Sequence, residues 1–362
     1  MALDHVRNAA YEAALQRVVT PESVVLDLGA GTGVLGLMAA RLGARRVYLV
    51  EPADILFVAE EIVRANGLED VVRCLHGRLE DVRVPEPVDV IVSVLTGNFL
   101  LTEDLLQTLL AARSQVLKPG GVLIPGAASM EAVPVSAPAL FEREVAAWSV
   151  AEHGVDLSGA RSYAANTIFY RGEELREARW LAEPAVLRTV DFHRDDDVSV
   201  HTEAVFEVIE SGMCHGWAGW FSMQLGESWL STSPQAAPVH WRAAFMPVDP
   251  PVALEKGECA AFVLDRSPLG DWSWRVRAGS VLRQHSTLLS APLSPDTLRR
   301  SAREYRPSLR ADGQMHLEVL ARCDGTASVD ELAGEMLARY PGRLRTHAEA
   351  LRFIQRIVRH HA

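Results

Sequence analysis

Apolar runs of strand length alternate with helix-like segments through the first 125 residues. The runs are short, and the segments between them carry apolar residues at helical spacing. The strand candidates are residues 23–28, 45–51, 71–76, 88–94 and 120–125, and the helix candidates are residues 34–44, 55–66 and 105–117. Alternating units of this kind predict an α/β fold with a doubly wound, Rossmann-like parallel sheet.

The first strand candidate runs into a glycine-rich turn, "LGAGTG", just before helical spacing resumes. Glycines let the backbone turn tightly and approach a ligand, while the free N–H groups of the following helix face that ligand. The next strand candidate ends in Glu51, where an acidic side chain can accept both hydroxyls of a ribose. These features predict a cofactor site at the ends of the first two strands.

Two cofactors compete for this turn. Gly31, Gly33 and Gly36 satisfy the dinucleotide pattern G-x-G-x-x-G. The longer pattern of Asp27, Gly29, Gly31 and Gly33 resembles motif I of the class I S-adenosylmethionine-dependent methyltransferases. Both cofactors carry a ribose, so Glu51 does not discriminate between a dinucleotide and S-adenosylmethionine. The longer pattern favours a methyltransferase over a dehydrogenase.

Composition narrows the function classes. The chain has 362 residues, 48% of them hydrophobic, which is enough for two or three packed units. A net charge of -11 argues against general nucleic-acid binding, because phosphate backbones are held by lysine and arginine. No window reaches the roughly 18 unbroken apolar residues of a membrane span. The four cysteines form no C-x-x-C pair, so neither a zinc knuckle nor a disulfide framework is expected. We expect a cytoplasmic protein.

Longer stretches of the chain resemble the protein arginine methyltransferases. The segments "VRNAAYEAAL", "VVLDLGAGTGVLGLMAARLGARRVYLVE" and "QVLKPGGVLIP" follow the catalytic half of that family in order and spacing. "WSVAEHGVDLS" resembles its dimerisation arm, and a His-Trp pair at His240 and Trp241 matches its C-terminal barrel. The resemblance covers residues 4–285. It implies a cofactor domain over 1–126, a β-barrel domain over 127–290 with the arm at about 148–182, and a homodimer.

The resemblance implies S-adenosylmethionine as the cofactor, held without a metal. Arg7 would grip the carboxylate of the cofactor, Glu51 the ribose, and Glu80 the exocyclic amine of the adenine. Each of three residues has an alternative role. Arg7 could be a solvated helix charge, Asp27 could only order the loop, and Glu80 could be an exposed turn residue. The implied cofactor-binding residues are Arg7, Asp27, Gly29, Gly31, Gly33, Glu51, Leu79 and Glu80.

The acceptor loop departs from the family pattern. The family holds a guanidinium ion between two glutamates at the ends of one loop; here the second is Glu103, but Val94 replaces the first and Leu95 replaces the aromatic residue after it. A lost carboxylate removes charge-assisted hydrogen bonds of about 1.5–3 kcal/mol each. An α-amine has a pKa of about 8, so a useful fraction is neutral near pH 7, and an apolar wall favours that neutral form. We therefore expect an amine acceptor, with Glu103 and His240 as catalytic residues.

The substrate pocket would be lined by Val94, Leu95 and Trp241. His240 could instead be a structural histidine of the barrel loop. In that role it would pack the barrel against the cofactor domain, and it would take no proton.

The last 70 residues form a different module. Residues 294–362 carry 12 Arg and no Lys against 9 Asp plus Glu. The segment "LARCDGTASVDELAGEMLARYP" resembles the PqqD-like domains, which recognise leader peptides of ribosomally made natural products. Three helical patterns beside a strand predict a winged-helix-like domain over 291–362, which would bind a peptide by strand addition. The alternatives are a DNA-binding winged helix and a structural cap.

Together these patterns predict an S-adenosylmethionine-dependent N-methyltransferase that acts on an amine of a peptide. One type that fits is the enzyme that N,N-dimethylates the terminal amine of daptide-like peptides. The alternative is a protein arginine methyltransferase that obtains its second carboxylate elsewhere. An alternative of another class is a non-catalytic scaffold in a biosynthetic complex, although a scaffold has no need of an intact glycine loop.

Overall fold

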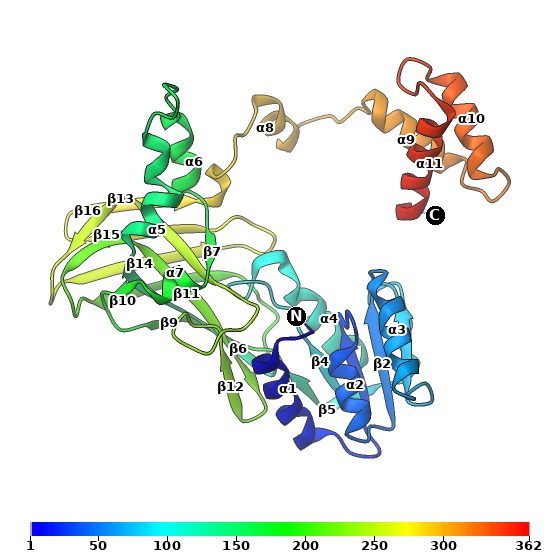
Figure 1. Cartoon of the computed structure of the whole chain (residues 1–362), viewed down its shortest axis with the longest axis horizontal. Coiled ribbons are helices and arrows are strands. Elements are labelled where there is room, and N and C mark those ends of the chain that lie inside the picture. Colours follow the sequence, from blue (N-terminus) through cyan, green and yellow to red (C-terminus); the bar gives the residue numbers. More distant parts are fainter. Residues whose placement is uncertain (1, 362) are drawn as a thin grey trace. The chain divides into compact units, whose positions relative to one another are not determined.

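The cofactor domain is a five-stranded parallel sheet in the order β3-β2-β1-β4-β5. The computed structural model describes residues 2–361. The sheet and its helices alternate along the chain as β1 (Val24–Leu28), α2 (Val34–Arg41), β2 (Arg46–Glu51), α3 (Ile55–Ala65), β3 (Val72–His76), β4 (Val88–Ser93), α4 (Leu106–Val116) and β5 (Leu117–Ile124), after an N-terminal helix α1 (His5–Val18) (Figure 1). The predicted doubly wound sheet is confirmed. β1 is buried along its whole length, as an apolar run in a parallel sheet requires.

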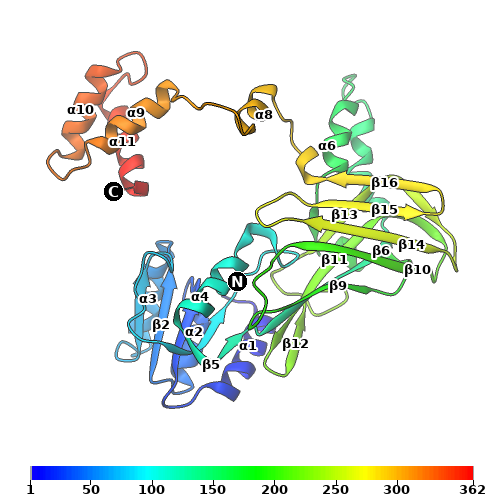
Figure 2. The ribbon, with the colours of Figure 1, turned by 180° about the vertical axis from the view of Figure 1, so that it is seen from behind.

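Antiparallel strands form the barrel-like domain, and they lie together in both views (Figures 1 and 2). One sheet has the order β7-β13-β11-β6-β8, with β12 on β11 and β9 on β6, and the other has the order β10-β14-β15-β16. Trp217 of β11 stacks on Phe262 of β14 at 5.0 Å, joining the two sheets in a shared core. The bounds are β6 (Ala127–Ser136), β7 (Phe169–Arg171), β8 (Arg179–Trp180), β9 (Ala185–Asp191), β10 (Val200–Glu207), β11 (Gly212–Leu225), β12 (Ser228–Ser231), β13 (Ala243–Leu254), β14 (Cys259–Arg266), β15 (Ser273–Ala278) and β16 (Val281–Ser286).

Short helices are inserted between β6 and β9 and form a projecting arm. They are α5 (Pro138–Glu144), α6 (Arg161–Ala165) and α7 (Glu173–Arg176), with 3-10 turns between them. In both views α6 projects away from the barrel-like strands (Figures 1 and 2). The arm leaves Trp148, Val150, Val155 and Leu157 exposed. An exposed cluster of large apolar side chains is typical of a contact surface.

The helix α1 ties the cofactor domain to the barrel-like domain. Its Tyr11 is fully buried and donates a hydrogen bond to the carbonyl of Ser93 at the end of β4, with Met223 of β11 at 3.3 Å from the same hydroxyl. Burial raises the pKa of Tyr11, so the hydroxyl stays a donor at any ordinary pH. The two domains therefore form part of one compact unit that extends to Pro292.

A second compact unit begins at Leu293 and is helical. It contains α8 (Pro295–Ser301), α9 (Ala311–Ala321), α10 (Val329–Arg339) and α11 (His347–His361). A capping box of Ser328 and Glu331 starts α10, and the core of the unit holds Met315, Leu332 and Ile354. In the part of this unit that the structure describes there is no strand, so the predicted strand is wrong and the winged-helix-like fold is not confirmed. Tyr305, Pro307 and Leu309 alternate with polar residues before α9, but Pro307 has no backbone N–H to donate and the described part of this unit has no second strand to pair with.

No helix within residues 2–361 is long and apolar enough to cross a membrane.

Candidate functional site

The glycine-rich turn lies at the carboxyl end of β1 and is held by the end of β2. The Glu51 carboxylate accepts hydrogen bonds from the backbone N–H groups of Gly31 at 2.9 Å and Ala53 at 3.0 Å. Gly31 and Gly33 have φ of 54° and 77°, a region that glycine adopts without strain. A Cβ at Gly33 would lie 2.8 Å from Leu49, whereas a Cβ at Gly31 would meet nothing within 4 Å. The turn is therefore packed on one side and open on the other, as a cofactor cradle requires.

Asp27 is buried beneath this turn, at 1% exposure. Its carboxylate accepts a hydrogen bond from the backbone N–H of Gly36 at 2.7 Å, which fixes the start of α2. Burial raises the pKa of Asp27 to about 7, although the N–H of Gly36 and the charge of Arg7 oppose that shift. Asp27 thus orders the loop from below.

Arg7 is buried at 3% exposure, which excludes the solvated helix charge. It follows the helix N-cap Asp4, whose carboxylate accepts from the backbone N–H of Arg7 at 3.1 Å. The guanidinium donates to the side-chain oxygen of Asn8, and it is near enough to Asp27 to act on its pKa. A buried cation therefore stands close to the glycine-rich turn, where a carboxylate ligand would be stabilised.

The turn after β3 carries the two residues predicted for the adenine. Leu79 is buried at 4% exposure, and Glu80 is exposed. The backbone N–H of Gly77 donates to the carbonyl of Glu51 at 3.0 Å, so this turn meets the end of β2. The carboxyl ends of β1, β2 and β3 therefore bring the predicted cofactor residues to one edge of the sheet.

The acceptor loop, defined here as residues 94–104, follows β4 at the same edge. Val94 and Leu95 are half-buried, and a Cβ at Gly29 would lie 2.7 Å from the Leu95 side chain. Leu95 thus packs against the glycine-rich turn. Gly97 can carry no side chain, because a Cβ there would lie 1.8 Å from the carbonyl oxygen of Thr102. The loop folds back on itself and brings its two ends together.

Glu103 is exposed near the end of the acceptor loop, with a φ of 74°. No described residue donates a hydrogen bond to its carboxylate, so its oxygens are open to a ligand. Its neighbours are held instead: the hydroxyls of Thr102 and Tyr170 lie 2.7 Å apart, and Asp104 pairs with Arg266 at 2.7 Å. The sequence singles out Glu103, but the residues that hold its neighbours come from the distant arm and barrel strands.

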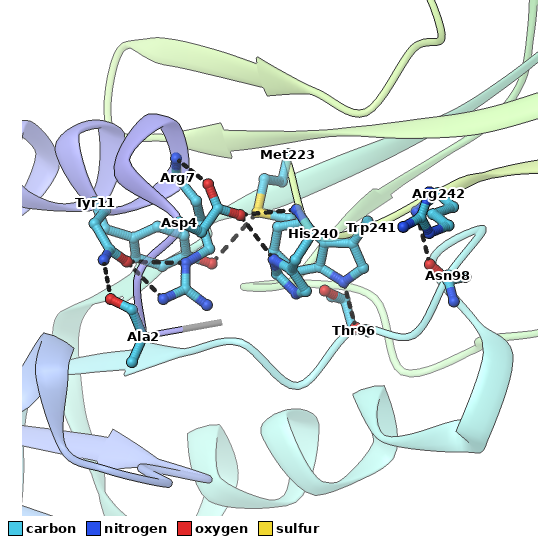
Figure 3. Close-up of polar contacts among 11 residues, drawn as sticks. Ala2, Asp4, Arg7, Tyr11, Thr96, Asn98, Met223, His240, Trp241 and Arg242 are labelled. Atoms are coloured by element: carbon cyan, nitrogen blue, oxygen red, sulfur yellow. Dashed lines mark hydrogen bonds and ion pairs between the residues drawn. The ribbon is translucent and has the colours of Figure 1, made fainter. Parts of the chain in front are cut away.

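The His-Trp loop of the barrel-like domain, residues 240–242, forms hydrogen bonds with both the start of α1 and the acceptor loop (Figure 3). The backbone N–H and the Nδ1 of His240 lie 2.8 and 3.0 Å from one oxygen of Asp4. Trp241 Nε1–H donates to the carbonyl of Thr96 at 2.9 Å, and the backbone N–H of Arg242 donates to the Asn98 side chain at 2.9 Å. The loop fastens the start of α1 to the acceptor loop.

The protonation of this pair follows from its surroundings. Burial lowers the pKa of His240, although the Asp4 carboxylate opposes that shift. Burial raises the pKa of Asp4, but the hydrogen bonds from Arg7 and His240 outweigh it and hold that pKa below its usual range. At neutral pH a charged Asp4 thus faces a neutral His240, whose Nδ1–H donates and whose Nε2 is left as a proton acceptor.

Three residues of the site are absent from the sequence predictions. Asp4 had a local signal, because an Asp three residues before a buried position at a helix start is typical of an N-cap. Tyr170 and Arg266 had none, since each lies on a barrel or arm strand with no motif around it. In the part of the chain that the structure describes, no group of three or more His, Cys, Asp or Glu residues could hold a metal ion.

Comparisons with known proteins agree with this geometry. Residues 25–121 match the family model described as a methyltransferase domain, and residues 126–271 match the arginine methyltransferase oligomerization subdomain. The probable protein arginine N-methyltransferase 6 of Arabidopsis thaliana is 31% identical over 303 residues, covering 71% of this chain and 69% of that protein. The chain belongs to the protein arginine methyltransferase family.

Other members of the family are similar in sequence and in fold. The probable histone-arginine methyltransferase CARMER of Drosophila melanogaster is 30% identical over 276 residues; the match covers 71% of this chain and about half, 51%, of that protein. The Trypanosoma brucei PRMT1 enzyme-prozyme heterotetrameric complex with AdoHcy superposes with a TM-score of 0.71 at 26% identity, and Arabidopsis thaliana protein arginine methyltransferase 10 with 0.67 at 25%. Each covers 78% of this chain and 95% of the solved chain.

The chain is therefore an S-adenosylmethionine-dependent methyltransferase. The residues present fit that cofactor: an open glycine turn, the acidic Glu51 at the end of β2 and the buried cation Arg7 meet at one edge of the sheet. The predicted amine acceptor on a peptide natural product is wrong, because the relatives are named as arginine and histone-arginine methyltransferases. Val94 and the resemblance of the C-terminal unit to the PqqD-like domains do not outweigh similarity to arginine methyltransferases over 71% of the chain.

Proposed function

We propose that this protein is a protein arginine N-methyltransferase, which transfers a methyl group to a guanidinium nitrogen of an arginine in a polypeptide. The observation that carries the proposal is the exposed Glu103 carboxylate on the acceptor loop, which packs against the glycine-rich turn through Leu95 and is held by the His-Trp loop of the barrel. Membership of the arginine methyltransferase family supports the same acceptor.

The bound S-adenosylmethionine supplies the methyl group as an electrophile. Arg7 and Glu51 would hold the carboxylate and ribose ends of that cofactor, and Leu79 and Glu80 its adenine. Glu103 would accept hydrogen bonds from the guanidinium, which orients one nitrogen toward the methyl group and concentrates the positive charge near the carboxylate. Val94, Leu95 and Trp241 would exclude water from the acceptor.

The nitrogen that gains the methyl carbon must lose a proton as the bond from that carbon to sulfur breaks. His240 would take this proton on Nε2, since burial keeps the ring neutral and Asp4 lies on the Nδ1 side. The ionised Asp4 would then stabilise the imidazolium that forms. Support for this division of roles comes from the hydrogen bond between the two residues at 3.0 Å.

The family has glutamates at both positions 94 and 103 of the acceptor loop. Because Val94 replaces the first, Glu103 is the single carboxylate of the two. A guanidinium ion bound by one carboxylate lacks charge-assisted hydrogen bonds that contribute about 1.5–3 kcal/mol each. We therefore expect weak binding of an isolated arginine side chain and a high KM for short peptides. Contacts outside the loop must then contribute to binding of the polypeptide substrate.

The test is methyl transfer to an arginine-containing peptide from isotope-labelled S-adenosylmethionine, with a peptide in which lysine replaces arginine as the matched control. Mass spectrometry should find ω-methylarginine in the first peptide and no label in the second. Glu103→Gln should abolish the product while cofactor binding, measured by calorimetry, is unchanged. Cofactor binding without any methylated arginine would refute the proposal.

We also propose that the protein is a homodimer that associates through the arm. The match of residues 126–271 to the oligomerization subdomain supports an oligomer. The arm carries a surface cavity of about 670 Å³, lined in part by Trp148, Val150 and Leu157. Light scattering should give the mass of two chains, and Trp148→Asp should shift it toward one. A wild-type monomer at micromolar concentration would contradict the homodimer.

The C-terminal helical unit is proposed to bind part of the polypeptide substrate. Its resemblance to the PqqD-like domains and its surface cavity of about 1060 Å³ support a peptide segment as the ligand. Arg352 and Arg356 in the lining favour an acidic segment, whereas Arg343 is paired with Asp312. Without a strand in the described part of the unit, binding would use helix faces. Arg352→Glu with Arg356→Glu should raise the KM of a long acidic peptide but not that of a short one; equal KM values would contradict it.

A further inference from the structure

The acceptor loop has a backbone conformation that L-residues rarely adopt. Phe99, Leu100, Glu103 and Asp104 have φ of 50°, 63°, 74° and 55°. This left-handed region is sparsely populated outside glycine, and such conformations persist only where the surrounding structure holds them. The conformation of Glu103, and hence the direction of its carboxylate, therefore depends on the contacts that hold the residues beside it.

Arg266, at the end of β14, forms an ion pair with Asp104, the residue that follows Glu103. It is buried, at 5% exposure, and one of its terminal nitrogens donates to both carboxylate oxygens of Asp104 at 2.8 and 2.7 Å. The backbone N–H of Leu269 donates to the same carboxylate at 3.2 Å. Asp104 is therefore fixed by two groups of the barrel-like domain, on the segment from β14 to β15.

The same barrel segment supports the other end of the strained stretch. The guanidinium of Arg266 lies 5.1 Å from the ring centre of Trp272, and the Trp272 ring lies 5.3 Å from Phe99. Phe99 in turn occupies the space of a missing side chain, since a Cβ at Gly219 would lie 2.7 Å from its ring. A continuous stack of side chains thus runs from Asp104 through Arg266 and Trp272 to Phe99.

Stability alone does not explain this arrangement. The Nε and Nη1 groups of Arg266 are buried and have no hydrogen-bond partner among the residues that the structure describes. Burying a cation with some of its donors unsatisfied is costly, and replacing a buried ion pair as a whole by apolar side chains is often neutral or stabilising. A cation retained under these conditions indicates a role other than packing.

We propose that Arg266 is a positioning residue: through its ion pair with Asp104 it sets the backbone at Glu103 so that the Glu103 carboxylate meets the acceptor. The inference rests on the proposed function, in which Glu103 binds the guanidinium of the substrate. Arg266 itself touches neither substrate nor cofactor in this scheme. It connects the barrel-like domain to the acceptor loop, 162 residues earlier in the chain.

The first test compares Arg266→Met with the wild type in methyl transfer to the arginine-containing peptide. We expect kcat to fall about ten- to a hundred-fold, since a misplacement of about 1 Å at a reacting group has an effect of that order. The affinity for the cofactor should not change, because the glycine-rich turn has no contact with Arg266. Arg266→Lys, which keeps the charge, should recover part of the rate.

A matched control is Arg113→Met. Arg113 is also largely buried and donates to the carbonyls of Phe192 and Asp195 and to Asp196, but it has no contact with the acceptor loop. It should lower the melting temperature without lowering kcat at a temperature where both variants are folded. An equal fall of kcat in Arg113→Met would overturn the proposal, because it would make the effect one of general stability.

Removing both partners gives a variant without an unpaired buried charge. If the pair acts as one unit, Asp104→Ser with Arg266→Met should lose no more rate than the worse single variant. Amide hydrogen exchange gives a readout that does not depend on the substrate: residues 97–104 should exchange faster in Arg266→Met, while residues 29–36 should not. Unchanged exchange at residues 97–104 would refute the positioning role even if the wild type methylates no arginine.

Discussion

Replacing Val94 by glutamate should strengthen the action of the enzyme on arginine. Val94 follows β4 at the carboxyl edge of the sheet, on the acceptor loop that also carries Glu103. A carboxylate there can form at least one further charge-assisted hydrogen bond with a guanidinium ion, which contributes about 1.5–3 kcal/mol. At about 1.4 kcal/mol per factor of ten, that corresponds to a roughly 10- to 150-fold rise in kcat/KM.

Two features of the structure reduce this gain. Val94 is half-buried beside Leu95, so a carboxylate placed there loses part of its hydration before the substrate arrives. It also adds to the loop, beside Glu103, a second carboxylate without a cationic partner among the described residues, and the guanidinium neutralises this charge only once it binds. We therefore expect about a tenfold rise in kcat/KM, at the lower end of the range, together with a lower melting temperature.

Val94→Gln is the matched control, because glutamine has the shape of glutamate without its charge. Initial rates should be measured on the arginine-containing peptide and on its lysine counterpart, with cofactor affinity followed by calorimetry. Val94→Glu should exceed both Val94→Gln and the wild type on arginine alone. Equal kcat/KM values for the Glu and Gln variants would refute the reasoning, since position 94 would then have no access to the guanidinium.

Further predictions concern pH and the helix that carries Arg7. Asp27 has its pKa raised by burial to about 7, so the folded state keeps a proton that the unfolded chain releases near pH 4. Stability to urea should therefore fall as pH rises from about 4 to 7, and Asp27→Asn should lack this component. His285 has its pKa lowered by burial to about 4, so the unfolded chain binds a proton first as pH falls below about 6.5. Stability should be lost over that window in the wild type and less so in His285→Gln; parallel urea curves would contradict either assignment. Asp4→Ala removes a helix cap of about 0.5–2 kcal/mol and the partner of His240, and it should weaken cofactor binding. An unchanged cofactor affinity by calorimetry would contradict that link.

Local patterns predicted the parallel sheet of the cofactor domain well. The strand candidates of the first domain correspond to β1 to β5, because a parallel sheet buried on both faces needs apolar runs that are visible in the sequence. The glycine-rich turn and Glu51 lie together in the structure for an equally local reason: both stand at the carboxyl ends of neighbouring strands. Their roles toward the cofactor remain predictions.

The C-terminal unit shows where local patterns were insufficient. Its helices α9, α10 and α11 follow their apolar spacing and the N-cap at Ser328. The strand expected beside them is absent from the described residues, since Pro307 in the segment before α9 cannot donate to a strand ladder and no partner strand lies in the described part of the unit. The resemblance to the PqqD-like domains thus predicted the helices correctly but not the strand.

The acceptor half of the site was decided by the tertiary structure. The sequence by itself determined that Glu103 is present, that Val94 stands where the family has an acid, and that the chain has a cofactor domain followed by a barrel. It could not show that His240 meets Asp4 across 236 positions, or that Arg266 holds the loop of Glu103. Contacts at such separations depend on how the barrel packs against the cofactor domain, and neither hydrophobic period nor turn chemistry carries that information.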